Sequence, residues 1–137
     1  MSGLVLKLAP KERVLINGAV VENGDRRTRV SILTPNANIL RLRDALHPDE
    51  AKTPVRRACY VAQLVLSGDV SEEDARPQIL SGIEHLSQAL RDSDSRRSLQ
   101  DASESVLAGR YYQAMKALRL LIPREDRLLS QVHSDGN

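Results

Sequence analysis

The amino-acid sequence predicts an α+β fold, with a small N-terminal antiparallel β-sheet of about five strands followed by a C-terminal helical bundle of three to five helices. Up to residue 43, apolar and polar residues alternate, as strands with one buried face require. Two Asn-Gly pairs interrupt this stretch, and such pairs favour tight turns between strands. After residue 52, apolar residues instead recur every three or four positions, which is the spacing of an amphipathic helix. We therefore divide the chain into a β module at residues 1–47, an α-helical region at 53–132 and a flexible tail at 133–137.

The predicted strands begin with residues 4–8, where leucine occupies every second position. Asn17-Gly18 and Asn23-Gly24 then each lie between apolar runs rich in β-branched residues. Because asparagine and glycine reach positive φ at low cost, we expect a tight hairpin turn at each pair. A third turn at Thr34-Pro35-Asn36 leads into a last strand that starts at Ile39.

The second half of this predicted sheet is rich in arginine: Arg26, Arg27, Arg29, Arg41 and Arg43. Side chains alternate between the two faces of a strand, so Arg27 and Arg29 share one face, and Arg41 and Arg43 share a face of the last strand. We expect these arginines to form one exposed basic face that attracts nucleic acid. The alternative is a solvated face whose charges discourage pairing between sheet edges.

The helical region opens at Thr53-Pro54, an N-cap followed by proline at the first helical position. That helix should run from Val55 to Leu66, and a second should start after Ser71. We expect Pro77 to interrupt or restart the second helix because proline lacks the N–H that a helix interior needs. Further helices are predicted at about 96–107, 111–121 and 124–132, separated by the polar break at 92–95, by Gly109 and by Pro123.

Charge differs between the two parts of the chain. Residues 1–57 hold 11 Lys and Arg against 6 Asp and Glu, a balance of +5, and residues 58–137 hold 9 against 12, a balance of −3. This asymmetry suggests two surfaces with different partners. No apolar run approaches the length of a membrane span, no signal-peptide pattern opens the chain, and one cysteine excludes an internal disulfide. We therefore expect a cytoplasmic protein that does not bind membranes.

The sequence offers no catalytic set. A glycine-rich phosphate loop is missing, because Gly18 and Gly24 lie in predicted hairpin turns. The three histidines are too far apart for metal-ligand spacing, and Cys59 lies among apolar helix residues, where a buried inert thiol is expected. The tyrosines fall in predicted helices, where packing in the core is favoured over stacking on bases. We expect neither an enzyme nor a cofactor or metal site.

Two stretches are distinctive: N-G-A-V-V-E-N-G-D-R-R at residues 17–27 and T-P-V-R-R at 53–57. They resemble the FlbT family, the flagellar biosynthesis repressors of alphaproteobacteria, and the likeness covers roughly the first 90 residues. The resemblance implies a post-transcriptional regulator that acts on the 5′ untranslated leader of flagellin mRNA, affects its translation and decay, and works with a second small regulator, FlaF.

Residues 4–46 contain, in order, L-V-L-K-L, I-N-G, R-V-S-I and T-P-N-A-N-I-L-R-L-R-D-A-L. This order resembles that of the carbon storage regulators. Those proteins bind messenger RNA leaders with a strand-end arginine and with residues of their first strand. The resemblance implies that Arg43 and the first-strand residues Leu4 and Leu6 line an RNA site. Leu42 stands where that family has a histidine, and those proteins lack the helical half.

Two functional hypotheses follow. In the first, an RNA-binding repressor contacts a flagellin mRNA leader through the first-strand leucines and the five arginines: Leu4, Leu6, Arg26, Arg27, Arg29, Arg41 and Arg43. In the second, an adaptor binds FlaF or flagellin and affects messenger RNA indirectly. A sheet this small has difficulty covering its own edges, so we also expect a homodimer.

Overall fold

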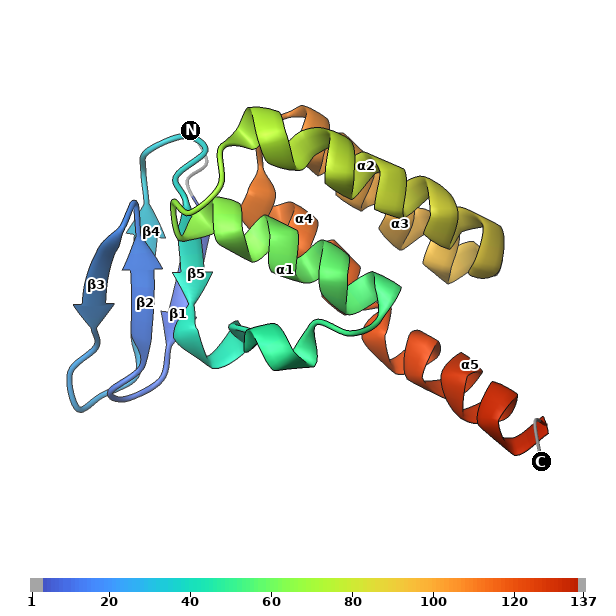
Figure 1. The fold of residues 1–137 in the computed structure, drawn as a ribbon. Coiled ribbons are helices and arrows are strands. Elements are labelled where there is room, and N and C mark those ends of the chain that lie inside the picture. The colour runs from blue at the N-terminus through green and yellow to red at the C-terminus, as the bar shows by residue number, and fades with distance from the viewer. Residues whose placement is uncertain (1–3, 136–137) are drawn as a thin grey trace.

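The computed structural model describes residues 4–135, with side chains to residue 131. Five strands precede five α-helices (Figure 1). The strands are β1 (Leu4–Leu8), β2 (Arg13–Ile16), β3 (Ala19–Glu22), β4 (Thr28–Ile32) and β5 (Ile39–Arg41). The helices are α1 (Pro54–Leu66), α2 (Glu72–Ala89), α3 (Ser93–Leu107), α4 (Tyr111–Arg119) and α5 (Ile122–Asp135). Short 3-10 helices at Leu42–Asp44 (η1) and Pro48–Glu50 (η2) link the two parts, so the predicted α+β class is confirmed.

The strands form two small antiparallel sheets where the sequence analysis expected one. β1 pairs with β4, and β2 lies between β3 and β5 in the second sheet. β1 and β5 come from different sheets but are tied by a side chain, because the Arg41 guanidinium donates to the Lys7 carbonyl at 2.6 Å. The alternation predicted for residues 4–8 is confirmed, since Leu6 and Leu8 are buried while Val5 and Lys7 are exposed.

The two Asn-Gly pairs have different roles. Asn17 (φ 49°) and Gly18 (φ 85°) form the expected tight turn between β2 and β3. The hairpin expected at Asn23-Gly24 is wrong, because β3 and β4 belong to different sheets and neither residue takes positive φ. The Asn23 amide instead donates to the carbonyls of Ala9 and Arg26, each at 2.8 Å, and so holds the chain as it crosses from one sheet to the other.

The first two helices begin where their caps predict. The Thr53 and Ser71 hydroxyls accept hydrogen bonds from backbone N–H groups in the first turns of α1 and α2. The interruption expected at Pro77 does not occur, because α2 runs through it to Ala89. Proline removes one hydrogen bond, to the carbonyl four residues earlier. Both Glu73 and Pro77 are exposed, so water can reach that carbonyl.

The later helices differ from the predicted ranges mainly at their ends. α3 starts three residues before the predicted Arg96, because the Asp92 carboxylate accepts from the Ser95 N–H at 3.1 Å and caps the helix there. α4 ends at Arg119, two residues before the expected end. α5 continues to Asp135, into the segment predicted as a tail, and residues 136–137 of that segment lie outside the described residues.

One apolar core joins the sheets to the helical bundle. α1 packs against α2 and α4, and α3 packs against the same two helices. β5 contacts α1 and contributes Ile39 and Leu40 to the core, while Tyr111 and Tyr112 are buried in α4, as expected from the sequence. α5 leaves the bundle and points away from it (Figure 1). None of the described helices has the length and apolar character that crossing a bilayer demands.

Leu118 in α4 tests this packing, with Leu120 as its matched control. Leu118 is fully buried and Leu120 is 68% exposed. Leu118→Ala should lower the free energy of unfolding by about 2–5 kcal/mol, because it removes buried methyl groups and leaves a cavity. Leu120→Ala should change it by less than about 0.5 kcal/mol. Urea unfolding followed by circular dichroism measures both, and equal effects would contradict this packing.

Candidate nucleic-acid interface

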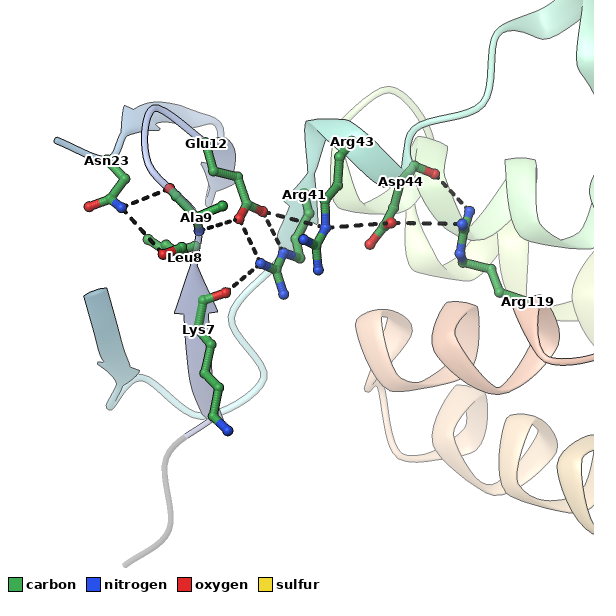
Figure 2. A network of polar contacts seen from close by, with 9 residues as sticks. All are labelled: Lys7, Leu8, Ala9, Glu12, Asn23, Arg41, Arg43, Asp44 and Arg119. Atoms are coloured by element: carbon green, nitrogen blue, oxygen red, sulfur yellow. Dashed lines mark hydrogen bonds and ion pairs between the residues drawn. The ribbon is translucent and has the colours of Figure 1, made fainter. Parts of the chain in front are cut away.

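A buried ion pair joins the turn after β1 to the last residue of β5 (Figure 2). Arg41 Nε donates to Glu12 Oε2 at 2.6 Å, and Arg41 Nη2 donates to Glu12 Oε1 at 2.8 Å. The two side chains are only 9% and 6% exposed. This two-pronged geometry is the strongest form of arginine–carboxylate contact.

The same pair binds three separate segments together. Arg41 extends from β5 to the Lys7 carbonyl of β1, and the Glu12 carboxylate accepts from the Ala9 N–H at 2.9 Å in the turn after β1. The Arg41 guanidinium is the main cause that lowers the pKa of Glu12 from its ordinary 4.5 to about 2. Glu12 is therefore ionised in the folded protein at any ordinary pH.

The burial of Arg41 corrects the sequence analysis. Arg41 was expected on an exposed face that it shared with Arg43 along one strand, and it is 8% exposed. β5 ends at Arg41, and Arg43 lies in the following 3-10 helix η1. The alternation expected for the strand would place Arg41 toward solvent. Arg41 can nevertheless be buried because the carboxylate of Glu12, which is distant in the sequence, balances the charge of its guanidinium.

Four other basic side chains come together on the surface beside this pair. They line a shallow groove of about 390 Å³, here called the basic groove, whose lining is Lys7, Leu8, Ala9, Arg27, Thr28, Arg29 and Arg43. Lys7 lies directly opposite Arg29 in the register of β1 and β4. The groove therefore joins residues from β1, from β4 and its approach, and from η1.

Carboxylates of the protein balance the charges of the basic groove only at Arg43, and there only in part. Within the described residues, no carboxylate lies within 4.0 Å of Lys7, Arg27 or Arg29. Arg43 reaches Glu12 at 3.7 Å and Asp44 at 3.9 Å, but Glu12 already belongs to Arg41. Like charges directly opposite on paired strands are destabilising. A bound anion would relieve that repulsion.

The structure therefore brings together only some of the residues predicted for the site. Arg27, Arg29 and Arg43 share the groove, while Arg26 is exposed but does not line it. Leu6 is 2% exposed and belongs to the core, so its side chain cannot contact RNA at the surface. Leu4 lines a different groove, beside Ile32, Leu33 and Arg110.

Lys7 is a groove residue that the sequence analysis did not select. The sequence pattern does indicate that Lys7 is exposed, because Lys7 is the basic residue on the exposed face of the alternating strand at residues 4–8. Which residue lies opposite Lys7, however, depends on the pairing of β1 with β4. That pairing joins segments more than twenty residues apart, and the sequence pattern alone does not specify it.

A second contact connects the groove to the bundle. The Arg119 guanidinium of α4 donates to the Asp44 carbonyl at 2.9 Å, and Asp44 adjoins Arg43 (Figure 2). Arg119 therefore helps to hold η1, which carries Arg43, against the helices. A substitution at Arg119 is consequently not a neutral control for experiments on the groove.

The T-P-V-R-R segment has a structural role at the start of α1. Thr53 caps the helix, and the buried Glu125 carboxylate of α5 accepts from the Val55 N–H at 2.8 Å. Arg56 binds both oxygens of Asp126, at 2.7 and 3.1 Å. These contacts fix the first turn of α5 on α1.

The described side chains, residues 4–131, include no metal-ligand cluster and no reactive thiol. No group of three or more His, Cys, Asp or Glu side chains among them could hold a metal ion. Burial raises the pKa of the Cys59 thiol to about 12, so this thiol stays protonated and unreactive.

The family of this chain follows from its sequence matches. The family described as flagellar protein FlbT matches residues 4–129, which is nearly the whole chain. The chain belongs to the FlbT family, and the resemblance seen in its N-terminal motifs is confirmed. No solved structure matches the chain.

Named relatives agree with this assignment. The flagellum biosynthesis repressor protein FlbT of Caulobacter vibrioides strain CB 15 is 33% identical over 131 residues, covering 96% of this chain and 92% of the relative. A protein of Caulobacter sp. strain K31, named as a probable flagellum biosynthesis repressor, is 33% identical over 94% of this chain and 98% of its own. Its counterpart from Rhodopseudomonas palustris strain CGA009 is 34% identical over 93% of this chain and 98% of its own.

Glu12→Gln tests the buried ion pair. It leaves the Arg41 charge buried without a partner, so the free energy of unfolding near neutral pH should fall by about 3 kcal/mol. In the wild type, the low pKa of Glu12 stabilises the fold fully above the unfolded value of 4.5, and this contribution is lost as the pH falls toward 2. The gap between variant and wild type should therefore close in acid.

Urea unfolding at several pH values measures that gap, and Glu22→Gln is the matched control. Glu22 pairs with Arg13 at 2.9 Å in the same module, but both side chains are exposed. Its replacement should have little effect because exposed ion pairs are screened by water. A gap for Glu12→Gln that stays constant from neutral to acid pH would contradict the assigned role.

Proposed function

We propose that this chain is a flagellum biosynthesis repressor that binds the 5′ untranslated leader of flagellin mRNA and represses its translation or promotes its decay. The observation that carries the proposal is the basic groove, where four cations from three separate elements converge with little internal compensation. Phosphate oxygens are the anions that such a cluster suits best. In this role the protein regulates by binding and performs no catalysis.

The lining of the groove supports contact with the RNA backbone and with base edges. It contains no aromatic side chain, so stacking on bases has no platform there. Arginine presents a planar fork of donors that can hold a phosphate or the edge of a guanine with two bonds. Arg27, Arg29 and Arg43 are the residues we assign to this recognition, with Lys7 as a point charge.

Arg29→Ala should weaken binding to a flagellin leader RNA and reduce its salt dependence. If Arg29 contacts one phosphate, the slope of the logarithm of affinity against the logarithm of salt concentration should flatten by roughly 0.7. Arg97→Ala, at an exposed arginine of α3, is the matched control and should change neither quantity. Stability should not fall in Arg29→Ala, because it removes a like charge opposite Lys7. Unchanged leader binding in a folded Lys7→Ala, Arg29→Ala double variant would remove the groove as the RNA site.

Arg43→Lys separates charge from geometry. Lysine keeps the positive charge but loses the planar fork. If Arg43 reads a base, the variant should lose about 1–3 kcal/mol for the preferred leader and should discriminate less between sequences. If Arg43 only neutralises phosphate, it should bind all RNAs much as the wild type does. Filter binding with the leader and a scrambled RNA distinguishes these results.

The alternative function is a protein adaptor that binds FlaF or flagellin and affects messenger RNA indirectly. The observation in its favour is α5, which projects from the bundle and exposes Leu128 and Leu129 by 40% and 39%. Leu128→Asp should weaken capture of purified FlaF or flagellin if the adaptor role holds. Partner capture without any salt-sensitive RNA binding would favour the adaptor over the repressor that binds RNA directly.

A further inference from the structure

β3 forms an open edge of its sheet. It has one neighbour, β2, and it is the strand farthest from the helices (Figure 1). All four of its residues are exposed, and Val20 and Val21 are 64% and 39% exposed. Nothing in residues 4–135 pairs with its outer side. An apolar edge strand of this kind is a ready site for pairing with another strand.

The direction of each backbone group on β3 follows from the hairpin. The turn at Asn17-Gly18 has two residues, so Ile16 and Ala19 form the closing hydrogen-bonded pair, and every second pair after it is hydrogen-bonded. Beyond the strand, the Asn23 N–H donates to the Glu12 carbonyl at 2.8 Å, which agrees with this alternation. The backbone groups of Val20 and Glu22 therefore point outward, away from β2.

We propose that β3 pairs antiparallel with β3 of a second copy of this chain, about a two-fold axis at Val21. In this register, Val20 of each copy faces Glu22 of the other copy, and each facing pair exchanges two hydrogen bonds. All outward N–H and C=O groups of both strands are then used. The two three-stranded sheets join into one six-stranded sheet.

The side chains fit this symmetric pairing. Val21 of one copy faces Val21 of the other copy. The two form a closely spaced pair without hydrogen bonds, where valine side chains pack well. Glu22 brings no unbalanced charge, because Arg13 of the same chain pairs with it at 2.9 Å. β4 also has an open edge, but Arg27 and Arg29 flank or occupy it, and such charges oppose edge pairing. β3 carries neither lysine nor proline to protect it.

The size of the contact predicts its strength. A strand of four residues contributes a small interface, well below that of a permanent dimer. The copies should therefore exchange readily and associate in the micromolar range. The basic groove lies on the other sheet, so this association and RNA binding can be tested separately.

Cross-linking tests the register. Val21→Cys places two thiols opposite each other in the closely spaced pair at the axis, so mild oxidation should give a covalent dimer. Cys59 is buried and should not compete. Val5→Cys is the matched control, because Val5 is 49% exposed on β1, away from β3. Equal cross-linking of both variants would overturn the proposed register.

Sedimentation equilibrium from low to high micromolar concentration tests the association itself. Val21→Lys puts two like charges at the axis and should raise the dissociation constant by about tenfold or more. Val20→Pro removes an outward N–H while leaving the β2–β3 bonds intact, so it should weaken the dimer even if Val21→Lys disturbs the fold. A wild type that stays monomeric, or a dimer that both folded variants retain, would overturn the proposal.

Discussion

The β module depends on the buried ion pair between Arg41 and Glu12. Its sheets are too small to bury many apolar side chains, and only a few, such as Leu6, Leu8 and Val14, are fully enclosed there. The ion pair compensates by joining β5, the turn after β1 and the β1 backbone through four short hydrogen bonds. Breaking such a pair costs far more than its net contribution, since the remaining charge is left buried.

This constraint also determines the surface. Both carboxylate oxygens of Glu12 accept hydrogen bonds from Arg41, so Glu12 balances the charge of Arg43 only weakly. The Arg43 side chain stays 57% exposed and lines the basic groove. Arg41 also holds the Lys7 carbonyl, and the Lys7 side chain points away from the network (Figure 2). The weak compensation of Arg43 therefore follows from the Arg41–Glu12 pair, whereas Lys7, Arg27 and Arg29 have no carboxylate nearby in the described residues.

The helical half positions this surface and adds one of its own. Arg119 holds η1 in place, and Glu125 and Asp126 fix the first turn of α5 on α1. Beyond that turn, α5 exposes Leu128 and Leu129 in part. The basic groove, the β3 edge and α5 lie on separate elements, so the contacts proposed for RNA, for a second copy and for a partner protein would use different residues.

Local sequence patterns were enough to predict the α+β class, the strand at residues 4–8, the turn at Asn17-Gly18 and the starts of α1 and α2, because each depends on residues within a few positions of one another. It also pointed to Arg27, Arg29 and Arg43 as exposed basic residues. The burial of Arg41, the position of Lys7 in the groove and the crossing of Asn23-Gly24 between two sheets follow from long-range contacts in the folded chain. Those outcomes rest on contacts such as Arg41–Glu12, which spans 29 residues. Local periodicity carries no information about which distant charge balances a given arginine.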